Sequence, residues 1–173
     1  MKKSDIYPLP EYFDRYINKC DEVELLTAIQ LSIDELLRFP IQQLEAIGDY
    51  TYAPGKWTIK DILQHLIDTE RIFTYRALAI ARKEQAALPS FSETDYAAQA
   101  VAGNRTLQSL IDELVTCHQS LKALYASFTN EMLLQKGKSF VGEYSVAAIG
   151  FTLAGHQRWH FEIIEEKYIN RKV

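Results

Sequence analysis

Four segments of this chain repeat apolar residues at steps of three and four, a spacing that gives an α-helix one apolar face. Each segment must bury that face, and loops separate all four, so the pattern predicts an all-α four-helix bundle. No segment between them is predicted to form a strand. The predicted helices cover residues 23–37, 58–82, 104–128 and 145–164.

Local signals mark the ends of these helices. Thr58 and Asp61 resemble a capping box, with Asp in place of the usual Glu or Gln, and Ser145 is the expected N-cap of the fourth helix. Pro40 ends the first helix, because proline disfavours a helical conformation in the residue before it. The connection over about residues 83–103 is long. It either changes the order of the helices in the bundle or covers a site, and the sequence leaves both open.

Composition is that of an ordinary globular domain. The 173 residues fit one domain, predicted to span residues 1–173, and 47% hydrophobic with 24% charged residues indicates neither disorder nor a fibrous protein. Lys plus Arg total 19 against 23 for Asp plus Glu, without any basic block. Because a duplex binder needs a basic face, no nucleic-acid partner is expected.

The cysteines and the N-terminus bear on the compartment. Cys20 and Cys117 form neither a C-x-x-C pair nor a disulfide ladder, and are interpreted as free thiols in a reducing compartment. The N-terminus has no apolar stretch of the kind a secretion signal needs, and no run reaches the roughly 18 apolar residues of a membrane span. A cytoplasmic location without a membrane partner is therefore expected.

Three histidines form the candidate site. His156 and His160 are four residues apart on the fourth predicted helix, so both imidazoles face the same way at a spacing of about 6 Å and can reach one metal ion. His65, in the middle of the second helix and beside its apolar stripe, is the best candidate for a third ligand. The alternative is that each histidine is a structural residue satisfied by hydrogen bonds. Spacing alone leaves both readings open, although burying two imidazoles without a shared partner is costly.

The residues around the histidines argue against two known classes of metal site. The HQRWH segment has Gln157 where a zinc metalloprotease has its Glu base, which argues against that class. No Glu stands three residues before a histidine, so the di-iron element of ferritin-like bundles is absent and one metal is expected. Three imidazoles leave a position for water or substrate, and zinc or nickel suits them best, with iron or manganese as alternatives. The ion could lower the pKa of a bound water or thiol and so generate a nucleophile.

Three further polar residues were considered. His118 is interpreted as structural rather than as a fourth ligand. Glu70 lies on the apolar stripe, where a contact with an arginine or the backbone is favoured over a catalytic base. Arg76 lies three turns from His65 on nearly the same side and could contact an anionic substrate, although a surface salt bridge is favoured.

Two glycines and a tryptophan have structural interpretations. Gly150 and Gly155 lie inside the fourth helix, where each costs about 1 kcal/mol relative to alanine, and close helix packing would offset that cost. Trp57, in the PGKW segment, is expected to close a turn over the end of the bundle, and no chemistry is assigned to it.

These motifs resemble the DinB superfamily, also described as DinB-like or YfiT-like metalloenzymes. The resemblance rests on W-[ST]-x-x-[DE]-x-x-x-H-x-x-D-x-E, found here as WTIKDILQHLIDTE, on the downstream Tyr96 and Asn104-Arg105 segment, and on the late G-H-x-x-x-H, found as GHQRWH. It implies an up-down-down-up bundle, often dimeric, with His65, His156 and His160 as the metal ligands. Many members have a histidine where this chain has Trp159, which leaves the three ligands intact.

The resemblance also implies an activity. Related proteins include metal-dependent transferases and isomerases that use low-molecular-weight thiols such as bacillithiol, mycothiol or glutathione. The expected function is therefore a thiol S-transferase or hydrolase acting on a small molecule through one divalent ion, in a homodimer. The alternative is a non-catalytic bundle in which a metal, if bound, only stabilises the fold.

Overall fold

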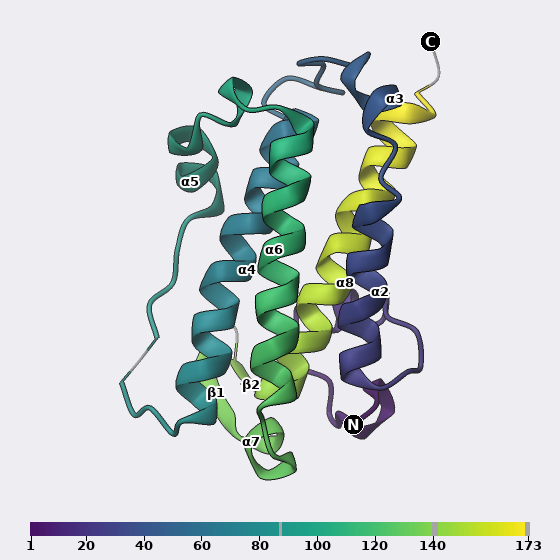
Figure 1. Cartoon of the computed structure of the whole chain (residues 1–173). Coiled ribbons are helices and arrows are strands. Elements are labelled where there is room, and N and C mark those ends of the chain that lie inside the picture. Colours follow the sequence, from purple (N-terminus) through teal and green to yellow (C-terminus); the bar gives the residue numbers. More distant parts are fainter. Residues whose placement is uncertain (87, 140–141, 172–173) are drawn as a thin grey trace.

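The predicted helices form the framework of the fold. The structure is a computed structural model that describes residues 1–86, 88–139 and 142–171 (Figure 1). Within these residues, long helices lie side by side, joined at both ends by loops and short elements. This confirms the predicted all-α four-helix bundle. The long helices are α2 (Leu25–Leu37), α4 (Ile59–Ala81), α6 (Leu107–Ala126) and α8 (Val146–Ile164).

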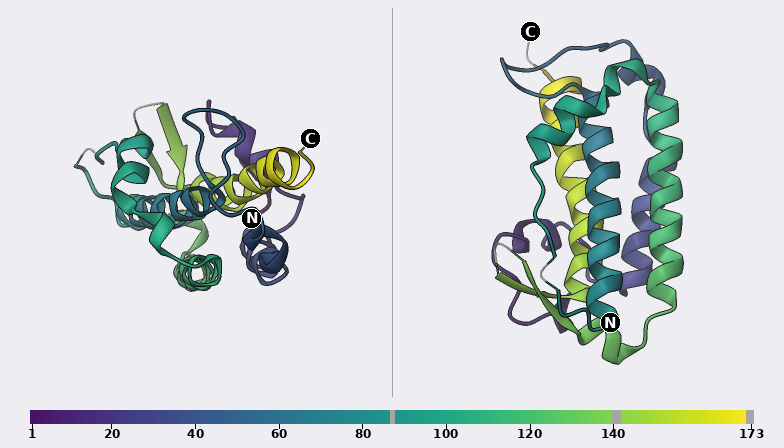
Figure 2. Two further views of the ribbon diagram at one scale, coloured as in Figure 1. Left: turned by 90° about the horizontal axis from the view of Figure 1, so that it is seen from above. Right: turned by 90° about the vertical axis from the view of Figure 1, so that its left-hand side faces the viewer.

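The order of the helices follows from the long connection. α2 packs beside α6 and α8, and so does α4, which places α2 and α4 on one diagonal of the bundle. In Figure 1, α2 and α8 run upward while α4 and α6 run downward. This is the expected up-down-down-up order. Because α4 and α6 are parallel neighbours, the chain between them must return along the length of the bundle, as Figure 2 shows.

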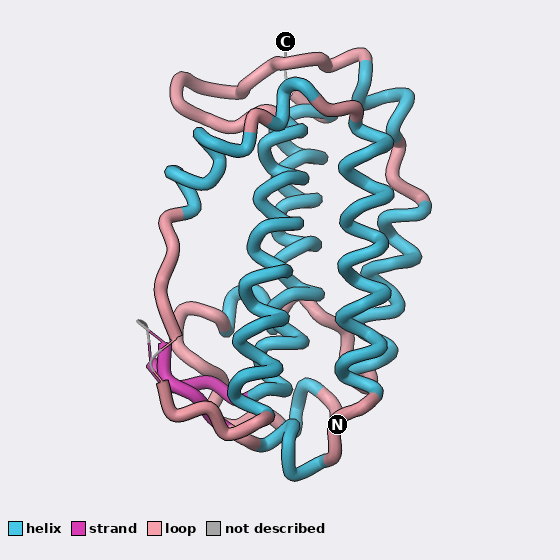
Figure 3. The backbone as a smooth tube through the Cα atoms, turned by 60° about the vertical axis from the view of Figure 1, so that its left-hand side comes forward, coloured by secondary structure: helices cyan, strands magenta, loops and turns pink. Residues whose placement is uncertain are grey.

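Short elements complete the ends of the bundle. Two antiparallel strands, magenta in Figure 3, pair Lys136 with Ser145 and Gly137 with Tyr144. Short helices and turns flank the long helices. These elements are η1 (Lys3–Asp5), α1 (Asp14–Ile17), α3 (Ile41–Glu45), α5 (Glu93–Ala100), η2 (Ala102–Asn104), α7 (Asn130–Leu134), β1 (Lys136–Ser139), β2 (Gly142–Ser145) and η3 (Glu165–Ile169).

Two sequence predictions about these segments were wrong. The segment before α8 was predicted to be a turn without strands, but it forms the hairpin of β1 and β2. The third helix was predicted to begin near Asn104, but α6 begins at Leu107. The Thr106 hydroxyl accepts a hydrogen bond from the Ser109 backbone N–H and so caps α6 three residues later than predicted.

The predicted caps of α4 and α8 are confirmed. The Thr58 hydroxyl accepts from the Asp61 backbone N–H at 3.2 Å, and the Asp61 carboxylate accepts from the Thr58 backbone N–H at 3.0 Å. The Ser145 hydroxyl accepts from the Ala148 backbone N–H at 3.1 Å. These caps satisfy N–H groups that the first turn of a helix leaves unpaired, and they fix where each histidine-bearing helix begins.

The core consists of two apolar clusters with a polar layer between them. One cluster joins the first half of α8 to the last turns of α4, and the other joins the first turns of α4 to the end of α8. Between them, α2, α4, α6 and α8 each contribute buried polar side chains. This layer, at mid-height in the bundle, holds the candidate site. Its members include Ser32, His65, Thr69, Glu70, His118, His156 and Gln157.

The two glycines of α8 lie at close contacts, as predicted. A Cβ atom added to Gly150 would lie 2.9 Å from side-chain atoms of Leu25 and Tyr125. A Cβ atom added to Gly155 would lie 1.8 Å from the backbone oxygen of Tyr16. The missing side chain of Gly155 therefore allows α1 to pack directly on α8.

Both cysteines are free thiols, as predicted. Burial raises the pKa of Cys20 to about 12 and that of Cys117 to about 11, so neither thiol ionises readily near neutral pH. Within the described part of the chain, no helix combines the length and apolarity needed to cross a bilayer.

Candidate metal centre

The three predicted histidines meet between α4 and α8. His65 lies in the second turn of α4, and His156 and His160 lie on successive turns of α8. The Nε2 atom of His156 is 3.2 Å from Nε2 of His65 and 3.0 Å from Nε2 of His160. The available ligand atoms of the three residues all lie within 4.8 Å of one another. The structure thus brings together all three residues that the sequence selected.

The spacing of these nitrogens suits one shared ion. Around a tetrahedral zinc ion with bonds of about 2.0–2.1 Å, neighbouring nitrogens lie roughly 3.3 Å apart. Hydrogen bonds between the three rings cannot satisfy all of their nitrogens, because Nε2 of His156 faces the Nε2 atoms of both His65 and His160. A neutral imidazole nitrogen offers one in-plane proton or one lone pair, so only one of these two contacts can be a good hydrogen bond. A cation between the three nitrogens would satisfy all of them.

The protein keeps these imidazoles neutral. Burial lowers the pKa of His65 to about 4 and that of His160, helped by nearby His65, to about 3. Burial also lowers the pKa of His156 far below its usual value, and the two neighbouring histidines lower it further. At neutral pH all three nitrogens therefore offer lone pairs, which is the form that binds metals.

Surrounding side chains orient the rings. The Thr69 hydroxyl lies 3.4 Å from Nδ1 of His65, one turn along α4. The hydroxyl can accept a hydrogen bond from Nδ1, an arrangement that leaves the lone pair on Nε2. The Tyr16 ring meets His156 edge to face at 4.9 Å between ring centroids, and the Trp57 ring lies 4.8 Å from His65.

A pocket of about 280 Å³ opens beside His160. Its walls come from the loop before α4, the end of α8, the η3 turn and the start of α5. None of the described residues that line it carries a carboxylate, and Lys56 supplies the one formally charged side chain among them. A cation on the histidines would thus border a cavity that carries no negative charge of its own. The lining residues are Tyr52, Gly55, Lys56, Trp57, Ile62, Thr94, His160, Ile163 and Tyr168.

Sequence reasoning missed several of these residues. It placed Trp57 in a turn with no chemistry, yet Trp57 lies against His65 and lines the pocket. Thr94 and Tyr16 were not considered, because they lie in short elements that carry no motif. The long connection, for which two explanations were open, does both: it changes the order of the helices and brings Thr94 to the pocket beside His160.

Gln157 points away from the histidine trio. Its Oε1 atom lies 2.7 Å from Nε2 of His118, and its Nε2 donates to the backbone oxygen of Ser32 at 3.0 Å. The other ring nitrogen of His118 lies 2.5 Å from the Glu70 carboxylate. Both nitrogens of His118 therefore face acceptors. Burial opposes its charge, but the Glu70 carboxylate outweighs burial and raises the pKa of His118.

These contacts decide two sequence predictions. His118 is structural, as predicted, and lies outside the trio. Glu70 does make a buried structural contact, but with His118 rather than with the predicted arginine or backbone partner. The buried Glu70–His118–Gln157 contacts link α4, α6 and α8.

The favoured interpretation of Arg76 was wrong. A surface salt bridge was predicted, but Arg76 is only 3% exposed, and none of the ion pairs among the described residues includes it. It also lies outside the pocket beside His160.

Comparison with known proteins decides the family. Residues 16–164 match the DinB superfamily. The chain belongs to the DinB superfamily. A member of similar sequence is the protein of Oceanobacillus iheyensis named "Putative metal-dependent hydrolase"; it is 26% identical over 165 residues, which cover 93% of this chain and 84% of that protein.

The DinB bundle is also recognisable in a solved structure. YfiT from Bacillus subtilis, described as "a probable metal-dependent hydrolase with an unusual four-helix bundle topology", matches with a TM-score of 0.69 at 15% identity. The match covers 92% of this chain and 87% of YfiT. At that identity the likeness speaks for the fold alone, and the fold agrees with the predicted YfiT-like bundle.

Proposed function

We propose that this DinB-superfamily chain is a metal-dependent enzyme that holds one divalent ion on His65, His156 and His160. The observation that carries the proposal is the convergence of three neutral Nε2 atoms at 3.0 and 3.2 Å beside a pocket. Zinc and nickel suit an all-imidazole set best. The names of the Oceanobacillus and Bacillus relatives support a metal-dependent reaction.

The reaction class that fits is hydrolysis, or transfer of a low-molecular-weight thiol to an electrophilic substrate. A divalent ion with three protein ligands and open positions lowers the pKa of a water or thiol that binds it. The chain's own residues would hold the ion and orient the substrate. Trp57, Tyr52 and Tyr168 offer aromatic walls, and Lys56 offers a positive charge for an anionic group. The pocket volume of about 280 Å³ suits a small substrate.

The first test is the metal content of four proteins purified without chelator or immobilised metal. The native chain and His118→Gln, which changes the fourth histidine, should each carry about one ion per chain. His160→Ala and His65→Ala should carry none, because two imidazoles hold a divalent ion much more weakly than three. Metal retained in both alanine variants, or absent from the native chain after incubation with zinc and nickel, would refute the site.

A second test separates an enzyme from a bundle that a metal merely stabilises. The cobalt-loaded native chain should change its visible spectrum when a small thiol is added, because an open position lets the thiolate bind. Hydrolysis of esters, and thiol transfer to electrophiles, should then depend on the metal. A cobalt spectrum that no thiol or anion changes, together with a large loss of melting temperature on chelation, would assign the metal a structural role.

A further inference from the structure

Arg76 is a buried cation away from the histidines. Eleven positions after His65 on α4, it lies about 16 Å farther along the helix axis. Its Nη2 atom donates to the backbone oxygen of Pro89 at 2.8 Å. Its guanidinium carbon lies 4.7 Å from the ring centroid of Phe73 and 5.8 Å from that of Phe91. These contacts fix the guanidinium group between α4 and the connection to α5.

Among the described residues, no carboxylate forms an ion pair with this cation. The Nη1 atom of Arg76 is buried and has no hydrogen-bond partner among these residues. Buried arginines are normally paired, because removing a charge from water is costly unless a partner replaces the lost hydration. Arg76 therefore retains an unused donor and an unbalanced charge.

Arg76 lines a pocket of about 590 Å³ between α4, β1 and the connection to α5. This pocket shares no lining residue with the pocket beside His160. Its other walls mix apolar and polar residues, and most of these residues are exposed, although Ile80 and Tyr144 are buried. The lining residues are Arg76, Ile80, Glu84, Gln85, Ala86, Leu88, Ser90, Lys136, Gly137, Lys138, Glu143 and Tyr144.

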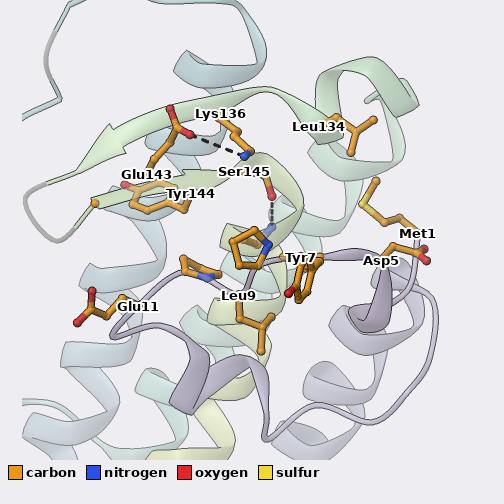
Figure 4. Close-up of a pocket in the computed structure, with 15 residues that line it drawn as sticks. Met1, Asp5, Tyr7, Leu9, Glu11, Leu134, Lys136, Glu143, Tyr144 and Ser145 are labelled. Carbon is orange, nitrogen blue, oxygen red and sulfur yellow. Dashed lines mark hydrogen bonds and ion pairs between the residues drawn. The ribbon is translucent and has the colours of Figure 1, made fainter.

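The other charged residues of this pocket leave it net positive. Glu143 pairs with Lys136 at 3.7 Å across the hairpin. Both residues also line a neighbouring pocket beside the N-terminal segment (Figure 4). The Glu84 carboxylate accepts from the backbone N–H groups of Gln85 and Ala86. Lys138 forms no ion pair with a described residue. Backbone N–H groups do not neutralise Glu84, so Arg76, Lys138 and Glu84 all remain without an ion-pair partner among the described residues, and three cationic side chains face two anionic ones.

We infer that this pocket binds a small oxyanion, a phosphate or a carboxylate group, on Arg76. The planar guanidinium group presents donors in a fixed fork that matches such groups, and Phe73 and Phe91 hold its plane in place. A bound anion would balance the buried charge of Arg76, whose Nη1 donor has no partner among the described residues. Because the two pockets are separate, this site is independent of the proposed metal chemistry.

The test is calorimetric titration of the full chain with inorganic phosphate and, separately, with succinate, against chloride at constant ionic strength. One of the two anions should bind saturably with one site per chain, and the tighter anion identifies the group. Arg76→Met, of similar length but uncharged, should weaken binding by about tenfold or more, since it removes a charged hydrogen bond. Arg82→Met, the same change at the exposed C-cap residue of α4 and outside the pocket, should bind like the native chain.

Three further variants keep the test decisive. His160→Ala should still bind the anion, which distinguishes this site from anion binding to a metal on the histidines. If Arg76→Met does not fold, Arg76→Lys and the exposed Lys138→Gln replace it, and each should weaken binding by roughly threefold or more. The inference fails if neither anion binds the native chain saturably. It also fails if the affinity is unchanged in Arg76→Met or, where that variant does not fold, in both replacement variants.

Discussion

At the scale of single residues, the sequence was most informative where one helix carries the pattern. His156 and His160 could be placed on one face from their spacing alone, and His65 was selected by its position beside an apolar stripe. Trp57 and Tyr16 could not be found this way. Each reaches a histidine from a loop or a four-residue helix, and its place depends on how that segment packs against α4 or α8.

Two opposing effects determine whether Gly155→Ala stabilises or destabilises the chain. Helix propensity alone predicts that Gly155→Ala stabilises the chain by about 1 kcal/mol. The new Cβ atom would, however, lie 1.8 Å from a backbone oxygen of α1, which cannot move without displacing that helix. Overpacking of this kind costs roughly 1–3 kcal/mol, so we expect net destabilisation. Urea denaturation measures the change.

Gly103→Ala is the matched control, since nothing lies within 4 Å of its added Cβ atom. Its free energy of unfolding should change by less than about 0.5 kcal/mol. A Gly155→Ala variant at least as stable as the native chain would mean that α1 does not pack on α8 as described.

At the scale of elements, helices with an apolar face and a cap were predictable, and elements without them were not. Thr58, Ser145 and the apolar stripes carried the signal for α4 and α8. α5 buries none of its residues, so it has no stripe to detect. Of the residues in the hairpin strands whose burial is described, only Tyr144 is buried, and a pattern of alternating apolar residues is therefore missing.

The capping box of α4 is expected to contribute measurably to stability. Thr58→Ala removes the hydroxyl that accepts from the Asp61 backbone N–H, and should lower the free energy of unfolding by about 1 kcal/mol. The control is Thr116→Ala, whose hydroxyl donates to the Asp112 backbone oxygen within α6. That change should stay within about 0.5 kcal/mol in urea denaturation. Equal effects in the two variants would argue against a special role for the cap.

At the scale of the whole molecule, a polar layer between two apolar clusters makes stability depend on pH. In the metal-free chain, folding lowers the pKa of His65 to about 4 and that of His160 to about 3. The unfolded chain takes up these protons near pH 6.5. Below that pH the unfolded state binds more protons than the folded state, so acidification favours unfolding.

We therefore expect the metal-free chain to lose stability as the pH falls from about 6.5 toward 4, by up to roughly 1.4 kcal/mol per pH unit for each histidine of the trio, whose pKa folding lowers. Urea denaturation with chelator at several pH values measures this slope. His65→Leu should reduce this slope by the contribution of one proton, up to roughly 1.4 kcal/mol per pH unit. This change distinguishes the histidines from the carboxylates that titrate at lower pH. A slope that His65→Leu leaves unchanged would contradict the assignment.

The contact between His65 of α4 and His156 of α8 also bears on the entropy of the unfolded chain. His65 and His156 are 91 residues apart in sequence, and the exposed connection between α4 and α6 lies within that interval. An ion held by both helices would act as a cross-link that closes a loop of this length, and would remove the entropy of the open loop from the unfolded ensemble. A chain nicked by a protease in that connection would then remain one particle, its two fragments held together by the ion and the core.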